Sequence, residues 1–141
     1  MLASFQTYLG GLIMGNHWSN QFLRALAQGN AARASELYAN KSYLKENMDP
    51  NLSLGSDHHD NTYLHYAALY GMEEMYEDLL TAQKGKPDMK NAERRNCIHM
   101  ICLGPTANDR TKCQMLELTF KEGLKGMDLQ HLLGEKDEVC N

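Results

Sequence analysis

Two histidines in matching surroundings are the first residues that could do chemistry. His65 follows Thr62 by three positions and His99 follows Asn96 by three positions, each at the start of an apolar stretch. A catalytic histidine needs a nucleophile beside it and a third residue that orients the ring. The sequence around neither histidine supplies that set. We therefore expect no catalytic residues in this chain and favour a structural role for both imidazoles.

The run at 57–60, Asp-His-His-Asp, places carboxylates next to imidazoles, and both are common zinc ligands. Adjacent residues of one loop seldom converge on a single ion, and no second group of ligands in the sequence pairs with this run. A solvated loop tip is the simpler interpretation. We therefore expect no metal and no cofactor.

The cysteines form no CxxC pair and occupy four separate positions: Cys97, Cys102, Cys113 and Cys140. A structural zinc site would require paired cysteines at regular spacing. The first three instead alternate with apolar residues, as small hydrophobic side chains of a core do, and nothing nearby supplies an oxyanion hole for a cysteine nucleophile. We predict core positions for these three and reduced thiols in a cytoplasmic protein, with disulfide bonds as the alternative.

Length and charge set the broad class. The 141 residues fit one domain, and the net charge of -4 argues against nucleic acid as a partner. No stretch approaches the roughly 20 apolar residues that cross a bilayer. The first 13 residues carry no charge, and we interpret them as a flexible extension. A signal peptide is the alternative, although its usual basic residues are missing.

An internal repeat organises the middle of the chain. The segments 61–71 and 95–104 have the same pattern, and their histidines are 34 residues apart. The ankyrin period is about 33 residues, and its first helix opens with Thr-Pro-Leu-His-x-Ala. Residues 62–67 read Thr-Tyr-Leu-His-Tyr-Ala, so the chain resembles ankyrin repeats. The resemblance implies an all-α solenoid in which each histidine hydrogen-bonds backbone groups of its own and the neighbouring repeat.

Apolar periodicity and turn residues place the helices of these repeats. The first repeat predicts helices at 63–70 and 73–81, followed by a polar loop at 83–91. The second predicts helices at 97–103 and 110–122, with a break at Gly104-Pro105 because proline cannot extend a helix. We predict that the inward face of the last helix contains Cys113, Leu116 and Phe120.

A divergent helix pair, predicted at 20–28 and 31–39, precedes the repeats. Terminal repeats of a solenoid diverge because one of their faces must meet water. The predicted inward residues are Phe22, Leu23, Leu26, Ala27, Ala34, Leu37 and Tyr38. We expect a flexible extension at 1–18, a capping pair and loop at 19–60, and repeats at 61–141. Because a short helix at 128–133 and a polar run end the chain where another repeat should begin, we expect a fragment of a longer protein.

Motifs outside the repeats narrow the resemblance. They are Met14-Gly15-Asn16, Phe22-Leu23-Arg24-Ala25-Leu26, Gly29-Asn30, Tyr43-Leu44-Lys45-Glu46, Asp49-Pro50-Asn51 and Cys102-Leu103-Gly104-Pro105. In this order they resemble the N-terminal region of the ankyrin-repeat and IBR-domain proteins, which are RBR-type, Ariadne-like E3 ubiquitin ligases. Tyr63 and Asn96-Cys97 depart from the Thr-Pro of the repeat motif. The resemblance implies that the zinc modules and the catalytic cysteine lie outside this chain, which is then no enzyme itself.

The ankyrin plan also implies which residues meet a partner and which hold the repeat together. The implied protein-binding surface is His58, His59, Asn61, Leu69, Tyr70, Ala92, Glu93, Arg95 and Leu103. The implied structural motif is Thr62, Leu64, His65, Ala67, Ala68, Gly71, His99 and Gly104. We therefore expect a protein-interaction module whose partner is a ligase substrate or the ligase's own modules. The alternative is a stand-alone or lipid-anchored adaptor with no link to ubiquitin.

The start of the chain yields a prediction of its own. Residues 14–19 match the N-myristoylation pattern Met-Gly-x-x-x-Ser, and relatives of the resembled family begin with Met-Gly-Asn. We predict a form that starts at Met14 and is acylated on Gly15, with reversible membrane binding because one acyl chain anchors weakly. The alternative is that Met1 is the start and the match is accidental. Mass spectrometry of N-terminal peptides from cells decides: only peptides that read through Phe5 to Met14 would rule the shorter form out.

Overall fold

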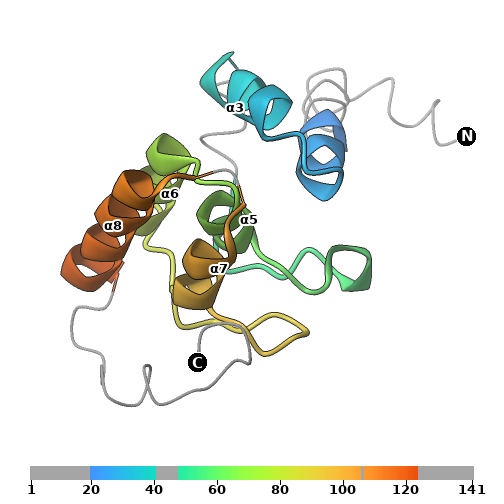
Figure 1. The fold of residues 1–141 in the computed structure, drawn as a ribbon. Helices are drawn as coiled ribbons and strands as arrows, with labels where there is room; N and C mark the ends of the chain where they lie inside the picture. Colours follow the sequence, from blue (N-terminus) through green and yellow to red (C-terminus); the bar gives the residue numbers. More distant parts are fainter. Residues whose placement is uncertain (1–19, 41–47, 106, 124–141) are drawn as a thin grey trace, which may run out of the picture. The chain divides into compact units, whose positions relative to one another are not determined.

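The computed structural model describes residues 20–40, 48–105 and 107–123, and within these ranges every regular element is a helix (Figure 1). The predicted all-α class therefore holds for the described part of the chain. Contacts divide the chain into two compact units, Met1–Asn47 and Met48–Asn141. Gly15, Cys140 and the helix predicted at 128–133 lie outside the described residues.

The first unit contains a helix at 20–27 and the helix α3, Ala31–Asn40. The Asn30 side chain accepts the backbone N–H of Arg33 at 3.1 Å and so satisfies a donor at the start of α3. The buried residues of α3 are those predicted: Ala34, Leu37 and Tyr38. The helix at 20–27 differs in part, because Ala25 is buried and Ala27 is exposed, so the inward face is rotated toward Phe22, Ala25 and Leu26.

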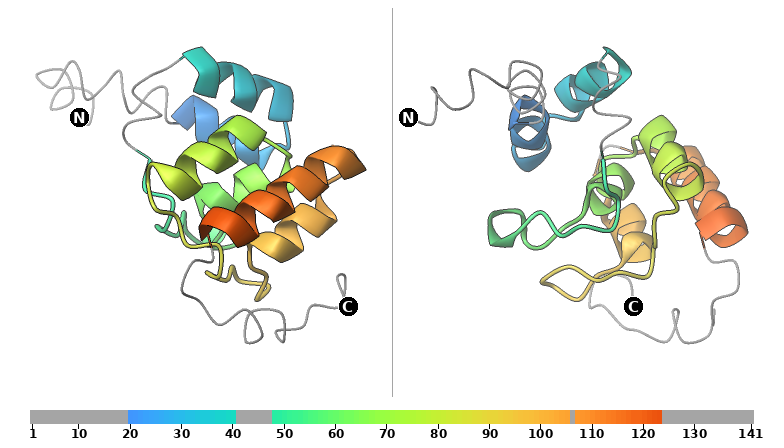
Figure 2. Two further views of the ribbon diagram at one scale, coloured as in Figure 1. Left: turned by 90° about the vertical axis from the view of Figure 1, so that its left-hand side faces the viewer. Right: turned by 180° about the vertical axis from the view of Figure 1, so that it is seen from behind.

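The second unit consists of two helix pairs, each made of a short and a longer helix. The first pair is α5, Tyr63–Leu69, and α6, Glu73–Thr81. The second pair is α7, Cys97–Leu103, and α8, Asp109–Leu118, which continues as the π-helical turn η2, Thr119–Gly123. α5 packs beside α7 and α6 beside α8, so the two short helices are neighbours and the two longer helices are neighbours (Figures 1 and 2). The predicted bounds of α6 and α7 are confirmed.

Side chains that precede α5 and α7 fix where these helices begin. The Thr62 hydroxyl accepts the N–H of His65, while the Asn96 amide oxygen accepts the N–H of His99. In return each histidine ring accepts the N–H of its capping residue. Both ends are therefore capping boxes in which histidine replaces the usual Glu or Gln.

Two glycines allow the helix pairs to approach closely. Gly71 has a φ of 66°, and a Cβ added to it would lie 2.7 Å from the Cβ of Ala107. A Cβ on Gly104 would lie 2.6 Å from the backbone oxygen of Leu69. Any other residue would force the neighbouring segments apart at these points.

The inward face of α8 was predicted wrongly. Cys113 is exposed, Leu116 is half-buried and Phe120 is 41% exposed. The buried residues of this segment are Met115 and Thr119, which are 1% and 0% exposed. The Thr119 hydroxyl donates to the Met115 carbonyl at 2.7 Å and lies 2.6 Å from the Tyr76 hydroxyl of α6. The buried face of this segment therefore includes a threonine, and a search for apolar periodicity could not identify that face.

The cysteine prediction is correct for one residue of the three that the structure describes. Cys97 is fully buried, and burial raises the pKa of its thiol far above the usual range, so the thiol stays protonated. Cys102 and Cys113 are exposed, which contradicts the predicted core positions. The second helix pair has no third pair stacked on it within the described residues.

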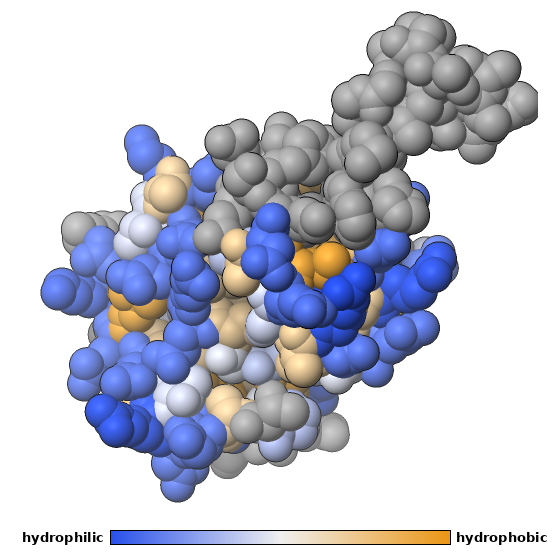
Figure 3. Space-filling view, turned by 90° about the horizontal axis from the view of Figure 1, so that it is seen from above, coloured by the Kyte–Doolittle hydropathy of each residue, from blue (hydrophilic) through white to orange (hydrophobic). Residues whose placement is uncertain are grey.

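Apolar surface is limited in the described part of the chain. Its exposed large hydrophobic residues are Leu52 and Phe120. Hydrophilic residues also predominate on the face drawn in Figure 3, where apolar residues form only small areas. Among the described residues, no helix has the length and apolar character needed to cross a membrane.

We predict that Thr119→Val destabilises the fold by about 1–3 kcal/mol, because the Tyr76 hydroxyl is fully buried and loses its acceptor. Adding Tyr76→Phe should recover part of the loss, since no unsatisfied hydroxyl then remains. Urea unfolding measures both free energies.

Thr81→Val is the matched control for this pair of variants. Thr81 makes the same type of local bond, to the Glu77 carbonyl at 2.8 Å, but it is exposed. The Thr81→Val substitution should change the free energy of unfolding by less than about 0.5 kcal/mol. A Thr119→Val protein as stable as the control would show that the bond across the helices is unimportant.

Candidate functional site

His65 joins the first helix pair to the loop that leads to the second. Its Nδ1 accepts the backbone N–H of Thr62 at 3.1 Å, so the ring proton of the neutral form is on Nε2. That Nε2–H faces two carbonyl oxygens, of Met89 and Arg95, each at 3.0 Å. Every polar atom of this fully buried ring is thus used in the structure. His65 thus bridges the cap of α5 and the loop that precedes α7.

Burial governs the protonation of His65. It lowers the pKa of the imidazole below 6.5, although the carbonyls of Arg95 and Met89 act in the opposite direction. A protonated ring would lose the bond from the Thr62 N–H, because Nδ1 would then carry a proton of its own. The neutral ring is therefore the form that this site holds.

Two loop tips lie beside each other on the same side of the second unit. One is residues 55–60, which includes the turn η1, Ser56–His58; the other is residues 91–95. The Ala92 N–H donates to the His59 carbonyl at 2.8 Å, and the Asn91 amide donates to the Asn61 side-chain oxygen at 2.8 Å. These bonds hold the two tips in register, so that residues of both loops form one surface.

Asn91 organises the second tip and was not singled out from the sequence. Its side-chain oxygen accepts the backbone N–H groups of Glu93 and Arg95, each at 3.0 Å, while its amide reaches Asn61. Asn91 is buried, and its side chain acts both as the acceptor within the second tip and as the donor to the first loop. The available signal was an asparagine at the start of a polar turn, where its side chain can replace a backbone partner.

Three tip residues adopt left-handed backbone conformations without being glycine: His59, Asp60 and Arg94, with φ values of 55°, 56° and 65°. Such conformations are uncommon for residues with a Cβ and persist where the surroundings fix them. Here the backbone bonds within each tip and the bond from the Ala92 N–H to the His59 carbonyl supply that restraint. The consequence is that the side chain of His59 is directed outward, 71% exposed, with its Nδ1 at 3.4 Å from a carboxylate oxygen of Glu93.

The residues predicted to bind a partner differ in their accessibility. His59, Ala92 and Glu93 are exposed, and a second group is half-buried: His58, Leu69, Tyr70, Arg95 and Leu103. Asn61 is only 5% exposed and accepts from Asn91. Its side chain is therefore part of the support and not of the surface, which corrects its predicted role.

An aromatic stack lies behind the first tip. The Nδ1 of His58 is 2.9 Å from the Tyr66 hydroxyl, and the two rings meet edge to face. Tyr66 in turn stacks on Tyr70, with ring centroids 6.0 Å apart and planes 13° apart. The stack fixes His58, so it does not converge with its neighbours in the Asp-His-His-Asp run on one point. Within the described residues, no group of three possible ligands could hold a metal ion.

Comparison of the sequence with known proteins tests the family resemblance. The chain is 38% identical over 92 residues to the mouse ankyrin repeat and IBR domain-containing protein 1, and the human protein of the same name matches equally. The resemblance read from the motifs is confirmed. The match covers 65% of this chain but only 8% of each relative, so the chain spans a small part of their length. No protein-family model matches the chain, and neither does any solved structure.

We predict that stability falls as the pH is lowered below about 6.5, because the unfolded chain then binds a proton at His65 that the folded chain resists. The stabilisation is complete above the pKa of the unfolded histidine and is lost as the pH falls toward the lowered pKa of the folded one. Urea midpoints at several pH values measure the slope. His65→Gln should be less stable at neutral pH and less sensitive to acid. An unchanged slope in that variant would contradict the assignment.

Proposed function

We propose that the second unit is an ankyrin-type module that binds another protein through the paired loop tips and the adjoining faces of α5 and α7. The observation that carries the proposal is the hydrogen bond between Ala92 and His59, which fixes exposed side chains of two loops as one surface. Loops positioned by a rigid scaffold are where binding residues concentrate in proteins.

Preorganisation favours binding at this surface. The tips are held by backbone bonds, by the buried Asn91 and by the ring of His65, so little loop entropy remains to be lost on association. The side chains offered are of mixed chemistry: an imidazole and a carboxylate at the tips, with apolar Leu69 and Leu103 half-buried on the helices. Such a set suits a protein surface better than a small molecule, which needs a concave pocket.

The similarity to ankyrin repeat and IBR domain-containing proteins supports a place for this module in an RBR-type ubiquitin ligase. In that setting the module recruits a substrate or contacts the ligase's own modules, and the transfer of ubiquitin is carried out by other parts. We propose a cytoplasmic location, with membrane association if Gly15 is acylated.

The test is a direct binding measurement with a partner isolated on the full chain as bait and then purified. His59→Ala/Glu93→Ala should weaken its binding about tenfold or more, as expected for two residues at the centre of an interface. Glu117→Ala is the control, because it removes an exposed carboxylate from α8 and leaves both tips intact. Partners that bind the double variant as tightly as the control would contradict the proposal.

A further inference from the structure

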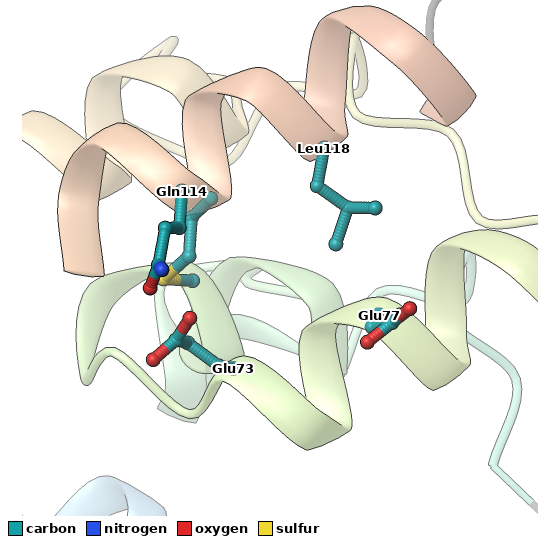
Figure 4. Close-up of a pocket in the computed structure, with 5 residues that line it drawn as sticks. Glu73, Glu77, Gln114 and Leu118 are labelled. Carbon is teal, nitrogen blue, oxygen red and sulfur yellow. The ribbon is translucent and has the colours of Figure 1, made fainter. Parts of the chain in front are cut away.

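A groove lies between the two longer helices, α6 and α8, and takes no part in the surface proposed above (Figure 4). Glu73 and Glu77 line it from α6, and Gln114, Met115 and Leu118 line it from α8. In Figure 4 the carboxylate of Glu73 points toward the amide of Gln114, and Leu118 extends toward the part of α6 that carries Glu77. The groove is thus acidic along one wall and apolar along its floor.

The acidic wall carries two exposed carboxylates. Both glutamates are exposed, and among the described residues no lysine or arginine forms an ion pair with either carboxylate. Glu73 begins α6 and interacts favourably with the helix dipole there, but Glu77 is one turn further along, where that effect has largely decayed. Two like charges at this spacing repel each other modestly, so an external cation between them is favourable.

The floor offers apolar contact next to these charges. Met115 is only 1% exposed and closes the base, and Leu118 is half-buried at the side. The volume is about 230 Å³. Small-molecule and cofactor sites usually occupy roughly 300–1,000 Å³, so this space matches a single long side chain better than a whole cofactor.

We propose that the groove receives an arginine side chain of a partner protein, as a second contact point on the side of the module formed by α6 and α8. The methylene groups of arginine would lie along Leu118, above the base that Met115 closes, while its guanidinium donates to Glu73, Glu77 and the amide oxygen of Gln114. Arginine fits better than lysine because its planar group has five donors and is less strongly hydrated. Its apolar stem also suits a floor of this kind.

N-acetyl-arginine amide is the probe, titrated into the full chain while the methyl signals of Met115 and Leu118 are followed by NMR. We expect both signals to shift in a saturable way, and N-acetyl-citrulline amide, which has the same shape without the charge, to leave them unshifted. Glu73→Gln/Glu77→Gln should weaken the arginine effect roughly fivefold, because each exposed carboxylate contributes modestly.

The matched control is Glu74→Gln/Glu117→Gln, which removes the same charge from exposed glutamates that do not line the groove. It should bind the arginine probe nearly as tightly as the unchanged chain. Equal shifts with citrulline, equal weakening in the two double variants, or no shift at either methyl group would overturn the proposal. Since the readout is local to α8, failure here is distinguishable from failure of the loop-tip surface.

Discussion

The buried, neutral imidazole of His65 is the interaction on which most of the second unit depends. One ring nitrogen completes the cap of α5, and the other reaches the two carbonyls that bracket the turn before α7. Because the ring has no exposed surface, water cannot replace either partner if one is removed. A single side chain therefore sets the start of one helix and the path of the loop that follows it into the next pair.

The surface at the loop tips follows from this constraint. With the backbone at Arg95 fixed by His65, Asn91 can bond the N–H groups of Glu93 and Arg95 and still reach Asn61 in the first loop. The left-handed residues beside it are then held by neighbours and not by their own preference. Exposed side chains at the tips can vary without loss of this frame, because the frame consists of backbone and buried amide groups.

Much of the fold could be predicted from the sequence, and the failures have a common cause. The bounds of α6 and α7 were predicted because apolar periodicity runs through both helices, Gly71 turns the chain before α6, and Gly104-Pro105 ends α7. The face of α8 was not, because its buried ridge contains Thr119, whose hydroxyl is satisfied by Tyr76 from a distant part of the chain. Asn91 was overlooked for the same reason: its role depends on Asn61, which lies 30 positions earlier.

Buried hydrogen bonds inside the second unit also explain how the two proposed binding surfaces, the loop tips and the groove between α6 and α8, can coexist on a small structure. The loop tips are supported by His65 and Asn91, whereas the groove between α6 and α8 is supported by the bond between Tyr76 and Thr119. The bonds of His65 and Asn91 lie in the loops, whereas the bond between Tyr76 and Thr119 joins α6 to η2, so a change in one support need not distort the other. A partner that touched both would be held at two points whose spacing is set by the rigid stack of helices, and linked contacts of this kind strengthen binding beyond what either offers alone.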